Sequence, residues 1–318
     1  MNVDAKLVER LYRKLRYIRR VEEEITRIYP SDKIKSPVHL SIGQEAIAVG
    51  VCEALRADDV VAGSYRGHAA YLAKGGDLPA MMAELYGKVT GCARGKGGSM
   101  HLVDMSHHVL GMSAVVGTTI PVAVGYALAI KREGTGRVVV SFFGDGATEE
   151  GVFYESLNFA ALHSLPILFV CENNRYAIHT PQTKRWASAD LCGRVSGFGV
   201  PARQIPDMDV FAIHSAAQAA VDGLRSGTAG PQLIECICYR WYEHVGVTQD
   251  YTAGYRTREE LSPWQEGDQV ARLGALLEAP VRTRIDGEVD REIEAAVNFA
   301  EQSPTPTPDE LYADVFAS

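Results

Sequence analysis

Residues 118–240 alternate short apolar segments with longer segments of helical periodicity, and this alternation limits the possible folds more than any other feature. Strands joined by helices of about ten to fifteen residues need right-handed crossovers, which make the strands parallel and place helices on both faces of the sheet. We therefore predict an α/β fold with a mostly parallel sheet. The expected helices are 118–132, 151–163 and 210–225, and the expected strands are 137–143, 166–171, 199–204 and 232–239.

The segments before this region predict two more helices, a strand and a long loop. Apolar positions at helical spacing indicate a surface helix over residues 4–29. Residues 43–55 favour a second helix, which precedes a short strand at 58–63. Residues 91–117 are rich in Gly, Ser, His and Met, a composition that favours a long loop.

The C-terminal part of the chain predicts a helical tail rather than a second core. Helical patterns around 267–278 and 288–302 precede a proline-rich stretch at 303–308. We expect residues 1–260 to form an α/β domain with an N-terminal helical arm. Residues 261–318 then form a helical tail that packs on this domain or on a partner.

The charge and apolar patterns exclude two classes of partner. The chain has 40 acidic and 32 basic residues and a formal charge of −8, so its surface does not favour phosphate backbones and we expect no nucleic acid partner. No apolar run approaches the roughly 18 residues that cross a membrane, and the N-terminus has no apolar signal segment. The six cysteines contain no CxxC pair and are typical of reduced thiols, so we expect a cytoplasmic protein.

Polar motifs directly follow two of the predicted strands. Gly144, Asp145 and Gly146 come after strand 137–143, and Asn174 follows strand 166–171. Because neighbouring parallel strands end at the same edge of a sheet, we expect Asp145 and Asn174 to face one ligand. Carboxylate, amide and main-chain oxygens suit Mg²⁺, which usually also binds phosphate oxygens. The glycines and the helix that starts near Glu150 favour a diphosphate at the same place.

Each of these motifs also has an ordinary structural explanation. A Gly-Asp-Gly sequence after a strand is often only a turn with an Asx cap, and Asn-Asn is common in loops. Their position at two adjacent strand ends favours a metal and diphosphate site over two unrelated turns.

The order and spacing of these motifs resemble a known family. Gly144–Asp145–Gly146 followed by Asn173–Asn174 is similar to the thiamine diphosphate motif. Four further motifs narrow the resemblance: HLSIGQEA at 39–46, YRGH at 65–68, GKGGSMH at 95–101 and YRWYEH at 239–244. With NNRYAI at 173–178, they resemble the alpha subunit of the decarboxylating first component of 2-oxo acid dehydrogenase complexes. Pyruvate, branched-chain and acetoin dehydrogenases share this pattern, and the resemblance covers about residues 5–260.

The resemblance implies a thiamine diphosphate-binding fold, bound thiamine diphosphate and Mg²⁺, and a set of site residues. The implied metal ligands are Asp145, Asn174 and the main-chain oxygen of Tyr176. The implied cofactor-binding residues are Tyr65, Arg66, Ala114, Val116, Gly144, Asp145, Gly146, Ala147, Asn174, Tyr176, Ile178 and His244. The implied catalytic residues are His39, His68 and His244. Without the resemblance, Arg66 could form a surface ion pair, His39 and His68 could cap helices, and Val116 could be core.

The resemblance also implies partners. Activation of this cofactor needs a glutamate from a complementary pyrimidine-binding domain, which we do not find in these 318 residues. A separate beta subunit supplies that glutamate in an α2β2 assembly, and a lipoyl-bearing acyltransferase accepts the acyl group. If the chain binds cofactor alone, the activating carboxylate lies within it, and Glu45 is a candidate.

The expected function is that of the alpha subunit of a 2-oxo acid dehydrogenase, which removes CO₂ from a pyruvate-like substrate and transfers the acyl group to a lipoyl acceptor. Three alternatives stay open: an acetoin dehydrogenase alpha subunit, a transketolase-like carboligase subunit that uses an aldehyde or sugar acceptor, and a non-catalytic subunit that keeps the fold. Val245 stands where phosphorylated relatives carry Ser, which excludes that regulation. We expect His179, Tyr242 and Glu243 to line the substrate end, which favours an acyl donor other than plain pyruvate.

Overall fold

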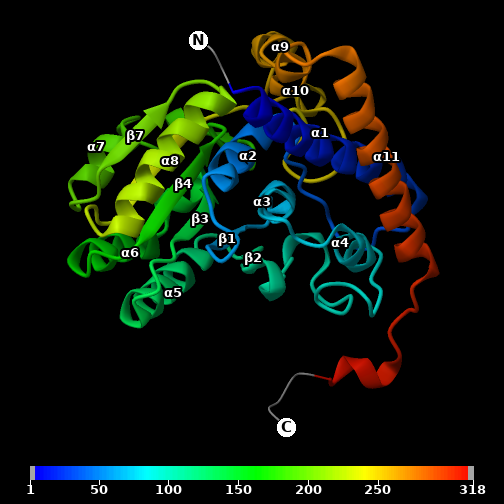
Figure 1. Cartoon of the computed structure of the whole chain (residues 1–318), viewed down its shortest axis with the longest axis horizontal. Helices are drawn as coiled ribbons and strands as arrows, with labels where there is room; N and C mark the ends of the chain where they lie inside the picture. Colours follow the sequence, from blue (N-terminus) through cyan, green and yellow to red (C-terminus); the bar gives the residue numbers. More distant parts are fainter. Residues whose placement is uncertain (1–3, 314–318) are drawn as a thin grey trace.

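The computed structural model describes residues 4–313, and its centre is a six-stranded sheet (Figure 1). The strand order is β2-β1-β3-β4-β8-β7, and every neighbouring pair is parallel. The predicted α/β fold with a parallel sheet is confirmed. The strands are β1 (Val60–Ser64), β2 (Val109–Ser113), β3 (Val139–Gly144), β4 (Ile167–Asn173), β7 (Ala202–Ile205) and β8 (Gln232–Ile237).

Helices cover both faces of this sheet because successive strand residues point to opposite faces and are apolar on each. On β3, Val140 and Phe142 join a hydrophobic cluster with α2 (Glu45–Glu53) and α8 (Val210–Ser226). Val139 and Phe143 point to the other face and join a second cluster. The helices of that second layer are α5 (Thr119–Glu133), α6 (Gly151–Leu162) and α7 (Leu191–Ser196). Strands buried on both faces are typical of parallel sheets.

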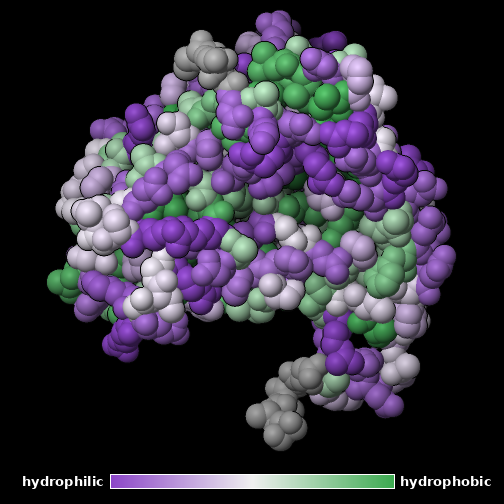
Figure 2. Space-filling model, viewed as in Figure 1, coloured by the Kyte–Doolittle hydropathy of each residue, from purple (hydrophilic) through white to green (hydrophobic). Residues whose placement is uncertain are grey.

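Helices from both ends of the chain, together with α3 and α4, build a helical layer beside the α2 and α8 face. Its helices are α1 (Ala5–Ile28), α3 (His68–Lys74), α4 (Leu78–Leu85), α9 (Arg258–Glu266), α10 (Gln269–Gly274) and α11 (Ala279–Gln302). Helix α11 packs against α4 and α1 (Figure 1), and Ile285, Val289 and Ile293 belong to the same hydrophobic cluster as α1. Figure 2 shows that mainly hydrophilic residues cover α1 and α11 on the outside.

Shorter elements connect the main helices and strands. A small antiparallel pair consists of β5 (Tyr176–Ala177) and β6 (Thr180–Pro181). The 3₁₀ helices are η1 (Tyr29–Ser31), η2 (Gly98–Met100), η3 (Met105–His107), η4 (Asp145–Glu149), η5 (Gln182–Lys184), η6 (Asp250–Ala253) and η7 (Pro308–Leu311). Between residues 4 and 313, no helix combines the length and the apolar character needed to cross a membrane.

Three predictions about local structure were wrong or incomplete. The segment 91–117 is not all loop, because β2 forms an edge strand that pairs with β1. Its sequence, VLGMS, has no clear strand pattern, so pairing with β1 determines its conformation. Helices α3 and α4 were not predicted, and α11 starts at Ala279 rather than near 288. Exposed charged residues on α11 weaken its periodic signal, whereas packing on α1 and α4 extends the helix.

Candidate functional site

A cavity of about 270 Å³ lies at the carboxyl edge of the sheet. Parallel pairing sets Gly144 opposite Glu172, so the segments that follow β3 and β4 leave the sheet side by side. The cavity is therefore where an open parallel sheet is expected to bind a ligand. The predicted site residues in its wall are Tyr65, Arg66, Val116, Gly144, Asp145, Gly146, Ala147, Asn174, Tyr176, Ile178 and His244.

Three predicted residues are not among those that line the cavity. The His39 ring packs 4.5 Å from the Tyr65 ring and 5.1 Å from the His244 ring, centroid to centroid, so it lies directly behind the wall. Ala114 immediately precedes the lining residues Val115 and Val116. His68 is buried elsewhere, with its Nδ1 3.1 Å from Glu22 and its Nε2 2.7 Å from Ser99.

One side of the cavity gathers oxygen ligands. Asp145 and Asn174 are both buried, and both line the cavity. The Asn174 amide donates to Gln44 at 3.2 Å, while its Oδ1 accepts the main-chain N–H of Tyr176 at 3.2 Å. Burial raises the pKa of Asp145, and its ion pair with Arg185 opposes this shift. Carboxylate and amide oxygens from two loops suit a hard cation such as Mg²⁺.

The other side of the cavity holds buried positive charge. Arg66 donates to the main-chain oxygens of Leu40 at 2.7 Å and of His244 at 3.1 Å. Burial, reinforced by Arg240, lowers the pKa of Arg66 to about 10. A guanidinium that is buried with carbonyl partners and beside a second cation favours an anionic ligand, because an anion would offset the cost of burying it. The wall residues therefore fit a diphosphate.

The histidines beside these cations are neutral. Burial and the charge of Arg66 lower the pKa of both His39 and His244 to about 3. The Tyr65 and His244 rings lie 5.6 Å apart, so these two residues and His39 form one aromatic cluster next to Arg66. Neutral imidazoles can donate at one nitrogen and accept at the other.

Burial contradicts two of the structural alternatives considered from the sequence. Arg66 is only 7% exposed, so it does not form a surface ion pair. Val116 is 41% exposed and Ile178 is 57% exposed, so Val116 is not part of the core. These two side chains form an apolar part of the cavity wall.

Several residues of the site were missed by the sequence analysis. Glu172 lines the cavity, and burial raises its pKa to about 7 although Arg66 opposes the shift. The sequence could have identified Glu172 as a site residue, because it directly precedes Asn173 and Asn174. Asn173 donates at 2.6 Å to the fully buried Glu235 on β8, which supports the segment behind Asn174.

A second support comes from the segment after β8. Arg256 forms an ion pair with buried Asp250 and donates to the main-chain oxygen of Asn174. Its guanidinium also lies 4.1 Å from the centre of the Tyr176 ring. Arg256 therefore holds the segment that carries Asn174 and Tyr176, although no sequence motif predicted this contact.

The fold and the cavity define the class of protein, and a family comparison agrees with it. A parallel α/β sheet with this cavity at its carboxyl edge is the arrangement expected of the thiamine diphosphate-binding fold. The model of the family described as "Dehydrogenase E1 component" matches residues 13–309. The chain belongs to this family of thiamine diphosphate-dependent oxidoreductases, and the resemblance found in the sequence is confirmed.

Individual relatives cover nearly the whole chain. The chain is 39% identical to the alpha subunit of acetoin:2,6-dichlorophenolindophenol oxidoreductase of Bacillus subtilis (strain 168), over 97% of this chain and 93% of the relative. It is 40% identical to the protein of the same name in Cupriavidus necator, over 99% and 96%. It is 37% identical to the alpha subunit of the pyruvate dehydrogenase E1 component of Zymomonas mobilis, over 99% and 90%.

Proposed function

We propose that this chain is the alpha subunit of a dehydrogenase that takes a 2-oxo acid or acetoin and passes the acyl group to a lipoyl group on another protein. The observation that carries the proposal is the cavity itself, which joins the oxygen ligands of Asp145 and Asn174 to the buried cation Arg66. Similarity to acetoin and pyruvate enzymes supports both substrates.

The residues of the cavity divide between a metal ion and the cofactor. Asp145, Asn174 and the main-chain oxygen of Tyr176 would hold Mg²⁺. Arg66, Tyr65 and His244 would bind the diphosphate, together with the main chain of Gly144, Gly146 and Ala147. Ala114, Val116 and Ile178 would contact the apolar parts of the cofactor. When bound, thiamine diphosphate supplies the electron sink that the removal of CO₂ requires.

The protein's own groups orient the reactants and handle protons. His244 lines the cavity and His39 lies directly behind it, and because both are neutral each could donate a hydrogen bond at one ring nitrogen and accept one at the other. His68 has both ring nitrogens in contact with Glu22 and Ser99, so we propose that it positions the turn of Tyr65 and Arg66.

The activating glutamate is proposed to come from a beta subunit. Glu45 is buried in an ion pair with Arg19 and does not line the cavity, which argues against the alternative within this chain. Glu172 lines the cavity but faces the charge of Arg66, at the proposed diphosphate end. The relatives are named as alpha subunits, which supports an assembly with a second chain.

We also propose how the chain is divided and where the protein is located. Residues 1–260 would hold the cofactor site, while 261–318 would pack outside it. The six free cysteines fit a cytoplasmic location. A carboligase or a non-catalytic subunit is less well supported, because the chain belongs to a dehydrogenase family and its cavity is lined by all of the proposed cofactor-binding residues except Ala114.

The first test is to isolate the native complex through a tag on this chain and to measure subunit masses and bound thiamine diphosphate. We expect a second chain and cofactor, with dye reduction on pyruvate or acetoin. Asp145→Asn should abolish Mg²⁺-dependent cofactor binding. A cofactor-loaded assembly of this chain alone, or a ketol product without an oxidant, would contradict the proposal.

A further inference from the structure

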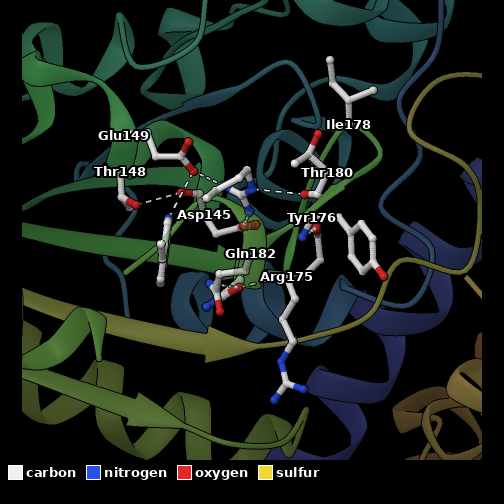
Figure 3. A network of polar contacts seen from close by, with 12 residues as sticks. Asp145, Thr148, Glu149, Arg175, Tyr176, Ile178, Thr180 and Gln182 are labelled. Carbon is white, nitrogen blue, oxygen red and sulfur yellow. Dashed lines mark hydrogen bonds and ion pairs between the residues drawn. The ribbon is translucent and has the colours of Figure 1, made fainter. Parts of the chain in front are cut away.

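Arg185 joins the two segments that form the proposed metal site. Its side chain is only 7% exposed and forms ion pairs with both Asp145 and Glu149. Its Nε donates to the main-chain oxygen of Thr180 at 3.0 Å. Figure 3 shows Asp145, Glu149 and Thr180 around one region, whereas Arg175 points away from it. One guanidinium therefore connects the segment after β3 to the segment after β4.

The guanidinium contacts the proposed metal-binding carboxylate but does not line the cavity. Asp145 and Glu149 line the cavity, but Arg185 is not among its lining residues. The contact uses Nη2 of Arg185 and Oδ2 of Asp145. This contact holds one carboxylate oxygen and does not itself engage Oδ1 of Asp145. This arrangement indicates support for the metal site rather than competition with the metal.

The same arginine fixes the position of the third proposed ligand. Tyr176 pairs with Pro181 in the small β5–β6 hairpin, next to Thr180. The bond from Arg185 to Thr180 therefore ties this hairpin to Asp145. Glu149 is itself held by Trp186, whose Nε1 donates to it at 3.1 Å.

We propose that Arg185 is a positioning residue that sets the Mg²⁺ affinity of the site. The inference rests on the proposed function, because it assumes that Asp145 and Tyr176 bind Mg²⁺. The planar fork of arginine serves two carboxylates and a carbonyl at once, which the single ammonium of lysine does not do. Residues that orient a metal ligand affect metal affinity without touching the metal.

The test measures Mg²⁺ affinity of the purified native complex at a fixed, saturating concentration of thiamine diphosphate, with Mn²⁺ binding by electron paramagnetic resonance as a second readout. Arg185→Gln should weaken metal binding about 10-fold. Arg185→Lys keeps the charge and should still weaken binding, by about 3-fold or more. The matched control is Lys184→Gln, which removes a neighbouring exposed cation and should leave the affinity unchanged.

Metal affinity decides the outcome, and thermal melting shows whether each variant is folded. Unchanged or tighter binding in Arg185→Gln would overturn the proposal, as would wild-type affinity in Arg185→Lys. If the glutamine variant does not fold, the lysine variant decides. Asp145→Asn distinguishes an error in the proposed metal site from an error in the role of Arg185. If Asp145→Asn leaves metal binding intact, the proposed metal site is wrong. If Asp145→Asn abolishes binding while Arg185→Gln behaves like Lys184→Gln, only the role of Arg185 is wrong.

Discussion

Two buried charged side chains, Glu84 and Arg66, have opposite surroundings. Glu84 on α4 is 1% exposed, and its carboxylate accepts main-chain N–H groups at 2.7–2.9 Å. The four donors are Ala93, Gly95, Gly97 and Gly98. Arg66 is also buried, with 7% of its surface exposed, but it donates to carbonyl oxygens beside a second cation and the cavity. A buried charge with a complete set of hydrogen-bond partners supports the fold, whereas a buried cation that borders a cavity and has no ion pair among the described residues indicates a ligand site.

The hydrogen bonds to Glu84 also explain why the segment 91–117 is rich in glycine. Gly95 has φ +76, and a Cβ there would lie 2.7 Å from the main chain of Gly87. Glycine is therefore required for close packing around Glu84. The motif at 95–101 supported the family resemblance, but none of its residues lines the cavity. Its role in the described structure is to shape a loop.

The largest loss of stability is expected when the hydrogen bonds to the Glu84 carboxylate are removed. Glu84→Ala would leave four N–H groups without their acceptor and should lower the free energy of unfolding by about 3–5 kcal/mol. Urea denaturation of the native complex measures this change. Glu84→Gln keeps one acceptor oxygen and should lose less. A loss below about 1 kcal/mol in the alanine variant would show that water replaces the carboxylate.

Arg66 should show the reverse pattern. Arg66→Gln removes a charge-assisted contact to the proposed diphosphate and should weaken thiamine diphosphate binding by about 10- to 100-fold at saturating Mg²⁺. Stability without cofactor should fall by about 1–2 kcal/mol, less than in Glu84→Ala, because two buried carbonyl oxygens lose a donor and Glu172 loses a favourable charge but no ion pair is broken. Calorimetric titration and melting of the cofactor-free complex measure the two quantities. A large loss of stability with unchanged cofactor affinity would remove the contrast with Glu84.

The neutral histidines predict a smaller effect that depends on pH. Their pKa falls from 6.5 to about 3 on folding, so the unfolded chain binds more protons between these values. The stability that the two neutral histidines contribute to the folded state is therefore lost as pH falls from 6.5 towards 3. The double variant His39→Gln and His244→Gln should lose stability less steeply than wild type between pH 6.5 and 4.5 in urea titrations. Equal slopes would show that these histidines protonate in the folded protein.

The smallest effect is expected for charges on the outer surface. Asp290 on α11 pairs with Arg20 on α1 at 3.1 Å, and the Asp290 side chain is 52% exposed. Asp290→Asn should change the free energy of unfolding by about 0.5 kcal/mol or less, because solvent screens exposed pairs. The measurement is urea denaturation at low and high salt. A loss comparable to that of Glu84→Ala would show that the α1 and α11 layer depends on its charges.

The sequence predicted those parts of the protein that depend on local pattern and strand order. Apolar segments identified β3, β4 and β8, and the order of a βαβ unit placed Asp145 near Asn174. The residues that hold these ligands were not predictable in this way. Arg185 is 40 positions from Asp145, and Arg256 is 82 positions from Asn174. Such contacts depend on how the loops close, which no periodicity records.

By itself, the sequence determined the parallel α/β sheet, the family and half of the residues that line the cavity. The sheet follows from periodic burial and the place of Asp145 and Asn174 from strand ends, whereas the family and the other site residues were implied by the resemblance of the motifs. Only the tertiary structure decided that His68 lies in a separate buried network and that Arg185 supports Asp145. The physical reason is that partners of buried charges are chosen in three dimensions, where segments far apart in the chain exclude water together.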